Sequence, residues 1–311
     1  MKLWVGVTDN QWFKYLAELR PDEVNFWRPG GGSFQALKRW DPFLFKLHSP
    51  YDYIVGGGFF VRYSAFPLSV AWEVFGQKNG APDFETFYDQ IRRYREPRGT
   101  IQPDPNIGCI VLTEPFFFGE ADWIPVPEDW HPSIVQGKTY DTEEPSGAAL
   151  WDKVKIVLEG HRFENAEVQE PEIIRERPRY GAEYVIRPRL GQGAFRVDVI
   201  EAYSRRCAIT GERTLPVLQA SHLKPVSESG PHSVDNGLLL RADFHILFDR
   251  GYITVSKDYR IEASRRIKDE FENGDEYYGF HGKQLAVLPA NAIERPSTEF
   301  IQWHNERVFV P

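Results

Sequence analysis

An acidic segment in the middle of the chain divides the sequence into two parts and limits how it can fold. Residues 100–185 carry 17 acidic and 7 basic side chains, whereas residues 1–99 have a net charge of +2 and residues 186–311 a net charge of zero. From about residue 141 this segment contains prolines and few aromatic residues, which is typical of a connector. A chain of 311 residues is expected to form two domains. We therefore predict a first domain at 1–140, a partly helical connector at 141–185 and a second domain at 186–311.

Charge and cysteine content restrict the classes of partner and compartment. The formal net charge of −8 does not exclude nucleic acid, because the acidic excess is confined to the middle and both ends can present basic faces. The two cysteines, Cys109 and Cys207, lie far apart, which excludes a disulfide scaffold and favours a reducing cytoplasm. No apolar run approaches the length of a membrane-spanning helix and none follows the N-terminus, so we expect neither a membrane span nor a signal peptide.

Short apolar runs separated by glycine and proline clusters predict a β-rich first domain. The expected strands cover residues 2–8, 23–27, 43–47, 53–61 and 107–113. The expected helices cover residues 67–75 and 83–94, and the connector should contain a third at 148–160. Strands with inserted helices indicate a small mixed barrel or a curved sheet. The predicted fold class is therefore α+β.

The stretch 215–261 contains the side chains that say most about a catalytic site. A strand expected at 217–223 contains Ser221 and His222, a polar loop leads to Asn236, and a short helix at 241–248 carries His245. The order is His, Asn, His, with offsets of 14 and 9 positions. Phosphodiester cleavage needs an activated water and a cation, and the ordinary pKa of histidine suits the first task.

At these positions the sequence resembles the HNH endonucleases. The matching segments are Cys-x-x-Thr-Gly at 207–211, Ala-Ser-His at 220–222, Asn-Gly-Leu-Leu-Leu at 236–240 and His-x-Leu-Phe-Asp at 245–249. The resemblance implies that His222 is the general base, that His245 binds the metal and that Asn236 ties the intervening loop. It also implies one divalent ion, Mg²⁺ or Mn²⁺, in a hairpin of two strands and a helix.

One position departs from the family pattern. Many HNH enzymes have an aspartate or histidine before the general base as a second metal ligand, and this chain has Ser221, whose hydroxyl is a weak ligand. Asp249 lies four residues after His245, on the same helical face, so we predict that it completes the metal shell. The alternative is that Asp249 only caps the helix or forms an ion pair with Arg250 or Arg241.

Three further residues have structural interpretations. Cys207 has no second cysteine nearby and is expected to be a small buried residue rather than a zinc ligand. His232 and His304 are expected to be ordinary surface or hydrogen-bonded histidines.

Residues 1–118 resemble the EVE-like members of the PUA superfamily, small barrels that bind modified or flipped bases. The segments that carry the resemblance are 4–7, 24–31, 43–47, 54–60 and 71–81. It implies an aromatic pocket that would hold an extruded base by stacking. The candidates for this pocket are Trp27, Trp40, Trp72, Phe59 and Tyr53. The candidates for phosphate contacts are Arg28, Lys38 and Arg39, followed by Arg92, Arg93, Arg95 and Arg98. The alternative is that the rings are core residues and that the helical arginines complement a helix dipole.

Together these resemblances predict a modification-dependent DNA endonuclease of the prokaryotic cytoplasm. The first domain would recognise 5-methyl- or 5-hydroxymethylcytosine in double-stranded DNA by base flipping, and the second would cut nearby. Two alternatives stay open: an HNH nuclease acting on RNA or unmodified DNA, and a modified-DNA-binding protein whose nuclease is inactive, which Ser221 would explain. Cutting of both strands favours a homodimer, although no interface is legible in the sequence.

Overall fold

The computed structural model describes residues 1–95, 102–166 and 190–311. The chain forms two compact units, Met1–Arg189 and Leu190–Pro311, and each is described by itself. Arg98 and residues 167–185 of the predicted connector lie outside the described residues. Within the described ranges we find no helix that is long and apolar enough to cross a membrane.

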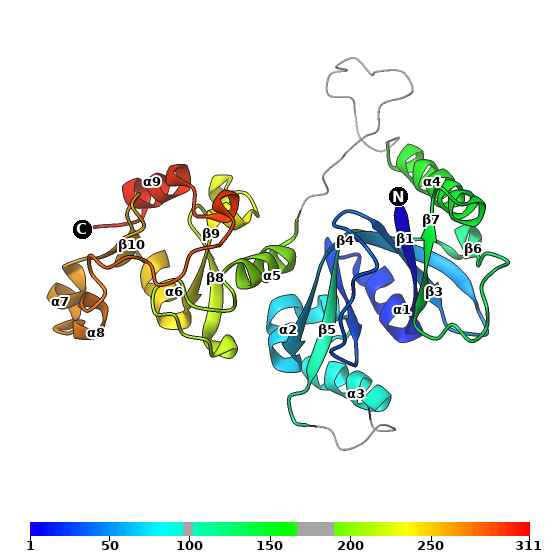
Figure 1. The fold of residues 1–311 in the computed structure, drawn as a ribbon, viewed down its shortest axis with the longest axis horizontal. Coiled ribbons are helices and arrows are strands. Elements are labelled where there is room, and N and C mark those ends of the chain that lie inside the picture. The colour runs from blue at the N-terminus through cyan, green and yellow to red at the C-terminus, as the bar shows by residue number, and fades with distance from the viewer. Residues whose placement is uncertain (96–101, 167–189) are drawn as a thin grey trace, which may run out of the picture. The chain divides into compact units, whose positions relative to one another are not determined.

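A mixed sheet forms the centre of the first unit, with the strand order β2-β5-β4-β3-β1-β7 and β6 paired to β4 (Figure 1). Its strands are β1 (Lys2–Thr8), β2 (Glu23–Arg28), β3 (Pro42–Leu47), β4 (Tyr53–Pro67), β5 (Asn106–Phe117), β6 (Ile124–Pro125) and β7 (Gly137–Asp141). Strands β1 and β3 are parallel, and the other pairs are antiparallel. No pairing joins β2 to β7 in the part of the chain described, so the sheet is curved but does not close. All five predicted strands are confirmed.

A glycine cluster lets β4 bend against its neighbours. A Cβ atom at Gly56 would lie 2.3 Å from the carbonyl oxygen of Phe116 on β5, and one at Gly57 would lie 2.6 Å from that of Phe43 on β3. The β4–β5 register shifts between Gly57 and Phe59. Backbones this close leave no room for a side chain, and a shift in register increases the local bend.

In the described ranges of the first unit, four α-helices accompany the sheet: α1 (Asn10–Leu19), α2 (Leu68–Phe75), α3 (Phe84–Arg95) and α4 (Pro145–Ala166). The predicted helices at 67–75, 83–94 and 148–160 are confirmed as α2, α3 and part of α4. We did not predict α1, although its signal is present in the sequence. Asp9 caps its first turn by accepting hydrogen bonds from the backbone N–H groups of Gln11 and Trp12.

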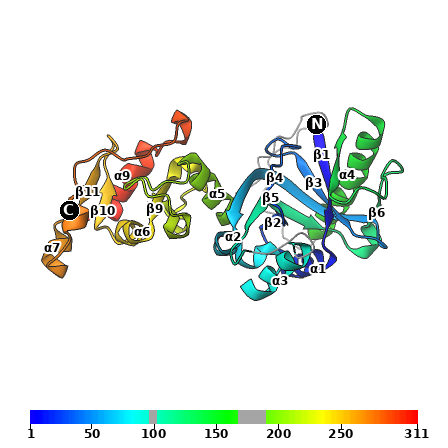
Figure 2. The same ribbon diagram turned by 60° about the horizontal axis from the view of Figure 1, so that its bottom comes forward.

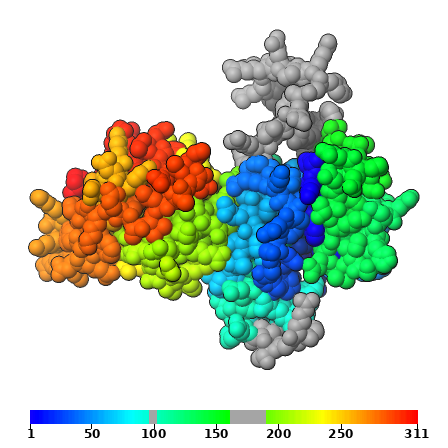
Figure 3. All heavy atoms as spheres, in the orientation of Figure 1, coloured from blue at the N-terminus to red at the C-terminus, as the bar shows by residue number. Residues whose placement is uncertain are grey.

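Helix α4 packs against one edge of this sheet. Leu150 and Val154 are buried in a cluster with Leu3 and Val5 of β1 and Tyr140 of β7. In the space-filling view, the green segment that ends in α4 lies directly against the dark blue start of the chain (Figure 3). The helix therefore belongs to the core of the first unit.

The second unit is built on two short hairpins with helices around them. Its strands are β8 (Leu218–His222), β9 (Gly237–Arg241), β10 (Ile253–Val255) and β11 (Ile261–Ala263). Its helices are α5 (Gln192–Ala202), α6 (Ala242–Asp249), α7 (Arg266–Phe271), α8 (Asp275–Tyr278) and α9 (Thr298–Arg307). Helix α6 contacts both hairpins, and α9 lies beside β10 (Figure 2). The α+β class is confirmed.

The packing of α4 can be tested with two substitutions in the same helix. Leu150→Ala should lower the free energy of unfolding of the first unit by about 2–5 kcal/mol, because it leaves a cavity beneath the helix. Ile156→Ala is the control, since Ile156 is 68% exposed and its loss should change stability by less than about 0.5 kcal/mol. Urea titration of the full chain, followed by tryptophan fluorescence, would measure both. Equal losses of stability in the two variants would contradict the packing of Leu150 against the sheet.

Candidate functional site

The candidate residues of the second unit converge on the β8–β9 hairpin and α6. His222 ends β8 and pairs with Gly237 at the start of β9. A Cβ atom at Gly237 would lie 2.6 Å from a methyl carbon of Val199, so glycine is required where α5 crosses the hairpin. Helix α6 begins one residue after β9 and carries His245. The two strands and the following helix thus form the predicted strand–strand–helix hairpin.

The His222 ring is held on two sides. It stacks on Phe195 of α5, with ring centroids 3.9 Å apart and an interplanar angle of 13°. Its Nε2 lies 3.2 Å from Nδ1 of His232, a residue of the loop between β8 and β9. Burial of the ring, and secondly the neighbouring His232, lower the pKa of His222 to about 4. The ring is therefore neutral near pH 7, which is the form that can accept a proton.

Asn236 closes the loop between the two strands. Its side chain is fully buried, and its Nδ2 donates hydrogen bonds of 2.9 Å to the carbonyl oxygens of Lys224 and Pro231. Its Oδ1 accepts a hydrogen bond of 2.9 Å from the backbone N–H of Lys224. These bonds join the start and the middle of the loop to a side chain at its end, as the resemblance implied for this residue.

His245, Asp249 and Ser221 lie together. Nε2 of His245 is 3.2 Å from Oδ2 of Asp249, and Oγ of Ser221 donates to Oδ1 of Asp249 at 3.4 Å. No contact joins Asp249 to Arg250 or Arg241 among the ion pairs found in the described residues; Arg241 pairs instead with Asp243 and Glu276. The structure thus brings the three predicted metal-binding residues together.

Gln219, which we did not single out from the sequence, orients His245. Its Oε1 lies 2.8 Å from Nδ1 of His245. Since a glutamine oxygen can only accept, Nδ1 must carry a proton, which leaves Nε2 as the nitrogen that can bind a metal ion. Gln219 and Ser221 are two positions apart on β8 and therefore share the face that meets α6. The two-residue spacing from Ser221 could therefore have identified Gln219 from the sequence.

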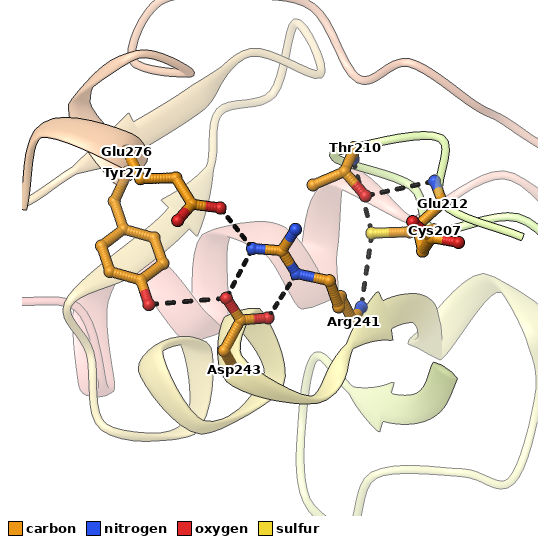
Figure 4. Close-up of polar contacts among 7 residues, drawn as sticks. All are labelled: Cys207, Thr210, Glu212, Arg241, Asp243, Glu276 and Tyr277. Atoms are coloured by element: carbon orange, nitrogen blue, oxygen red, sulfur yellow. Dashed lines mark hydrogen bonds and ion pairs between the residues drawn. The ribbon is translucent and has the colours of Figure 1, made fainter. Parts of the chain in front are cut away.

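A second network fixes the start of α6 (Figure 4). Arg241 donates two hydrogen bonds of 2.7 Å to Asp243 and one of 2.6 Å to Glu276. Sγ of Cys207 accepts from the backbone N–H groups of Thr210 and Arg241 at 3.4 and 3.3 Å. Cys207 is buried, as predicted, and also joins the Cys-x-x-Thr-Gly turn to the strand that precedes His245.

The proposed base and metal-binding side chains face a separate cavity of about 630 Å³. Its walls include His222, His245 and Asp249, together with His232, Arg196 and His304. In the part of the chain described, no group of three or more His, Cys, Asp or Glu side chains is arranged to hold a metal ion. One imidazole nitrogen, one carboxylate and one hydroxyl nevertheless fit a divalent ion that keeps several waters and takes further oxygens from a substrate phosphate.

The first unit contains a separate cavity of about 490 Å³ between β1, β2 and α1. Aromatic rings dominate its wall: Trp4, Trp12, Phe26, Trp27, Phe34 and Tyr94. Its polar groups include Asp9, which accepts a hydrogen bond of 2.8 Å from the Tyr94 hydroxyl, and Arg28, which donates to Gln136 at 2.7 Å. Nε1 of Trp27 donates to the carbonyl oxygen of Asn79 at 2.9 Å, which fixes the ring.

Two of the residues predicted for base and phosphate binding, Trp27 and Arg28, line this cavity; the other candidates within the described ranges do not. Trp72 packs on Phe84 and Phe87, Phe59 on Phe116, and Tyr53 on Trp123. Arg39 lies over the ring of Trp40, and the backbone N–H of Lys38 is bonded to Asp41. Trp4, Trp12 and Phe26 were missed, because only the sheet brings β1, α1 and β2 together.

Comparison with known proteins supports the interpretation of the second unit. Residues 207–256 match the family described as HNH endonuclease. The ASCH structure from Zymomonas mobilis is 12% identical, with a TM-score of 0.34 over 47% of this chain and 93% of that one. A structure described as the modification-dependent TagI restriction endonuclease is 13% identical, with a TM-score of 0.29 over 92% of this chain and 75% of that one. These two likenesses are too distant to carry an argument, and no curated protein matches the sequence.

The second unit is thus an HNH nuclease module, and the protein is a nuclease. Its hairpin, loop-tying asparagine and helical histidine have the arrangement that the sequence resemblance implied. HNH endonucleases generally use a divalent metal ion.

The buried His304 gives the second unit a pH-dependent stability. Burial lowers its pKa from 6.5 to about 4, while its Nε2 donates to the carbonyl oxygen of Phe248. Between about pH 4 and 6.5 the unfolded chain therefore binds more protons than the folded one, so the free energy of unfolding rises with pH in this window and is lost as the pH falls. Hydrogen exchange at the amides of α6 and α9, corrected for the intrinsic rate, should show this increase.

His304→Gln keeps a donor near Phe248 but cannot titrate. Its exchange should depend less steeply on pH than that of the wild type. Identical slopes for the two proteins would contradict a neutral, buried His304.

Proposed function

We propose that the protein is a modification-dependent DNA endonuclease that binds a modified cytosine in its first unit and cuts DNA with its second. The observation that carries the proposal is the presence, in one chain, of an HNH nuclease module and a separately folded unit with an aromatic cavity. A nuclease module by itself needs no such cavity. A flipped base, in contrast, needs aromatic faces for stacking and a few polar groups for its edge.

In the nuclease unit, His222 acts as the general base. It takes a proton from water, the water oxygen forms a bond to phosphorus, and the bond from phosphorus to the leaving oxygen breaks. The lowered pKa of His222 keeps the ring ready to accept that proton at neutral pH. Arg196, on the wall of the same cavity, is suited to contact the phosphate.

His245 and Asp249 are the proposed metal ligands, with Ser221 as a weak third donor. Gln219 keeps the lone pair of His245 on Nε2, beside the Asp249 carboxylate. Mg²⁺ or Mn²⁺ is the proposed ion, as the family resemblance implies, and the carboxylate and hydroxyl oxygens suit both ions. When bound, such an ion would neutralise charge on the phosphate and on the leaving oxygen.

In the first unit, Trp27 and its neighbours form the proposed base site. The hydrogen bond from Trp27 to Asn79 and the one from Tyr94 to Asp9 preorganise the wall. An apolar 5-methyl group, or a 5-hydroxymethyl group, would then add contact with the aromatic faces. Cutting both strands would require two copies of the chain, and defence against foreign DNA in a prokaryotic cytoplasm is the corresponding biological role.

The two roles in the nuclease site predict different kinetic effects. His222→Ala should reduce cleavage by about 10²–10⁴-fold at every metal concentration, since it removes the base. Asp249→Asn should raise the magnesium concentration needed for half-maximal cleavage, and manganese should partly restore the rate. Cleavage of 5-hydroxymethylated plasmid over a metal titration would separate them. Residual cleavage above a tenth of wild type in His222→Ala, or an unmoved metal titration in Asp249→Asn, would overturn the corresponding role.

Base recognition can be tested with two tryptophans. Trp27→Leu should reduce the preference for modified over unmodified duplex by about 1–3 kcal/mol, because stacking is lost. Trp72→Leu is the matched control, because Trp72 packs on Phe84 and Phe87 and does not line the cavity. Fluorescence anisotropy with labelled duplexes would measure the preference, and circular dichroism would show that both variants fold. Equal losses of the preference in both variants would show that Trp27 does not recognise the modified base.

The choice of substrate distinguishes the alternatives. Incubation of the wild type with 5-methylated, 5-hydroxymethylated and unmodified DNA, and with RNA of the same sequence, should give cleavage of modified DNA alone, and a chelator should abolish it. Cleavage of unmodified DNA or RNA would favour a nuclease without modification dependence. Binding of modified DNA without cleavage would favour an inactive nuclease.

A further inference from the structure

The contact between His222 and His232 allows only one hydrogen between the two rings. Nε2 of His222 and Nδ1 of His232 are 3.2 Å apart. One of these nitrogens must donate and the other must accept, because two bare lone pairs repel and two N–H groups clash. The contact therefore couples the proton position on one ring to that on the other.

Only one direction of this bond is compatible with a base at His222. If His232 donates, Nε2 of His222 uses its lone pair to accept, and a neutral ring then carries its proton on Nδ1. No lone pair is left for water. If His222 donates from Nε2, its Nδ1 remains unprotonated and can accept a proton.

We propose that His232 is a positioning residue that holds His222 in the tautomer protonated at Nε2 and leaves Nδ1 as the basic atom. This inference rests on the proposed role of His222 as the general base. His232 does not react itself. It accepts one hydrogen bond and thereby fixes both the tautomer and, together with Phe195, the plane of the His222 ring.

The loop is built to hold His232 in place. Asn236 donates to the carbonyl oxygen of Pro231, the residue that directly precedes His232. On the other side of Pro231, the backbone N–H of Gly230 donates to Pro225, and a Cβ atom at Gly230 would lie 1.8 Å from the carbonyl oxygen of Lys224. The Phe195 ring also reaches His232, with centroids 5.6 Å apart. Asn236 thus acts on His222 through Pro231 and His232.

The tautomer can be observed without DNA or metal. In the full chain labelled with ¹⁵N-histidine at pH 7.5, long-range ¹H–¹⁵N correlation spectra distinguish a ring protonated at Nε2 from one protonated at Nδ1. The His222 signals are those missing from the spectrum of His222→Asn. We expect the Nε2–H pattern in the wild type and a mixture of tautomers in His232→Ala. An Nδ1–H pattern in the wild type, or an unchanged His222 pattern in His232→Ala, would overturn the proposal.

Two conservative variants sharpen the kinetic test. In His232→Asn the amide oxygen can take the place of Nδ1, whereas in His232→Gln the amide lies where Nε2 was. On DNA amplified with 5-hydroxymethylcytosine, His232→Ala and His232→Gln should lower kcat by about 10²-fold, as expected for a misplaced base. His232→Asn should recover most of this loss. KM and the half-saturating magnesium concentration should not move in any of the three.

The outcomes separate this proposal from the one it rests on. If His222→Ala still cuts, the general base is wrong, whatever the behaviour of His232. If His222→Ala is inactive but His232→Ala keeps at least a third of the wild-type kcat, only the role of His232 is wrong. Equal kcat values for the Asn and Gln variants would also overturn it, because a structural role would not depend on where the polar atom lies. Thermal unfolding of each variant controls for folding.

Discussion

The nuclease site depends on the hydrogen bonds of one buried amide. Asn236 has no exposed surface, and its three bonds hold Lys224, at the start of the loop that follows His222, and Pro231, in the middle of that loop. An amide can do this because it offers donors and an acceptor in one rigid plane, and a buried polar group left unpaired would cost about 1–3 kcal/mol. Any side chain without both functions would release the loop, and with it His232.

Burial in the second unit has a chemical as well as a structural effect. Phe195 covers one face of the His222 ring and removes it from water, which lowers its pKa because the charged form loses solvation. The side of the site with the proposed metal ligands is different: the Asp249 side chain is 58% exposed. The proposed base is thus sheltered while the proposed ligand Asp249 is open, in one cavity, and the open side is where a phosphate and its waters can enter.

In the first unit, hydrogen bonds keep a cavity open within an aromatic-rich sheet. Trp27 and Tyr94 cannot collapse into the space because each is tied to a fixed group, the carbonyl oxygen of Asn79 and the carboxylate of Asp9. Asp9 is itself fixed, since it caps α1. The glycines of β4 bend the sheet around this region by allowing backbones to approach where a side chain would clash.

The sequence alone was sufficient for the parts of this protein that depend on local order along the chain. Strands β1 to β5 of the first unit, the hairpin with its helix and the spacing of His222, Asn236 and His245 follow from short apolar runs and ordered motifs, and the i, i+4 relation placed Asp249 beside His245; β6 and β7 gave no such signal. What it could not determine is which distant side chains meet. In the sequence His232 is an ordinary loop residue, and only the hydrogen bonds of Asn236 to the loop bring it beside His222. Trp4 and Trp12 line the cavity only because β1 and α1 pack beside β2. Such contacts depend on loop closure and on the packing of elements far apart in sequence, and no local pattern encodes either of them.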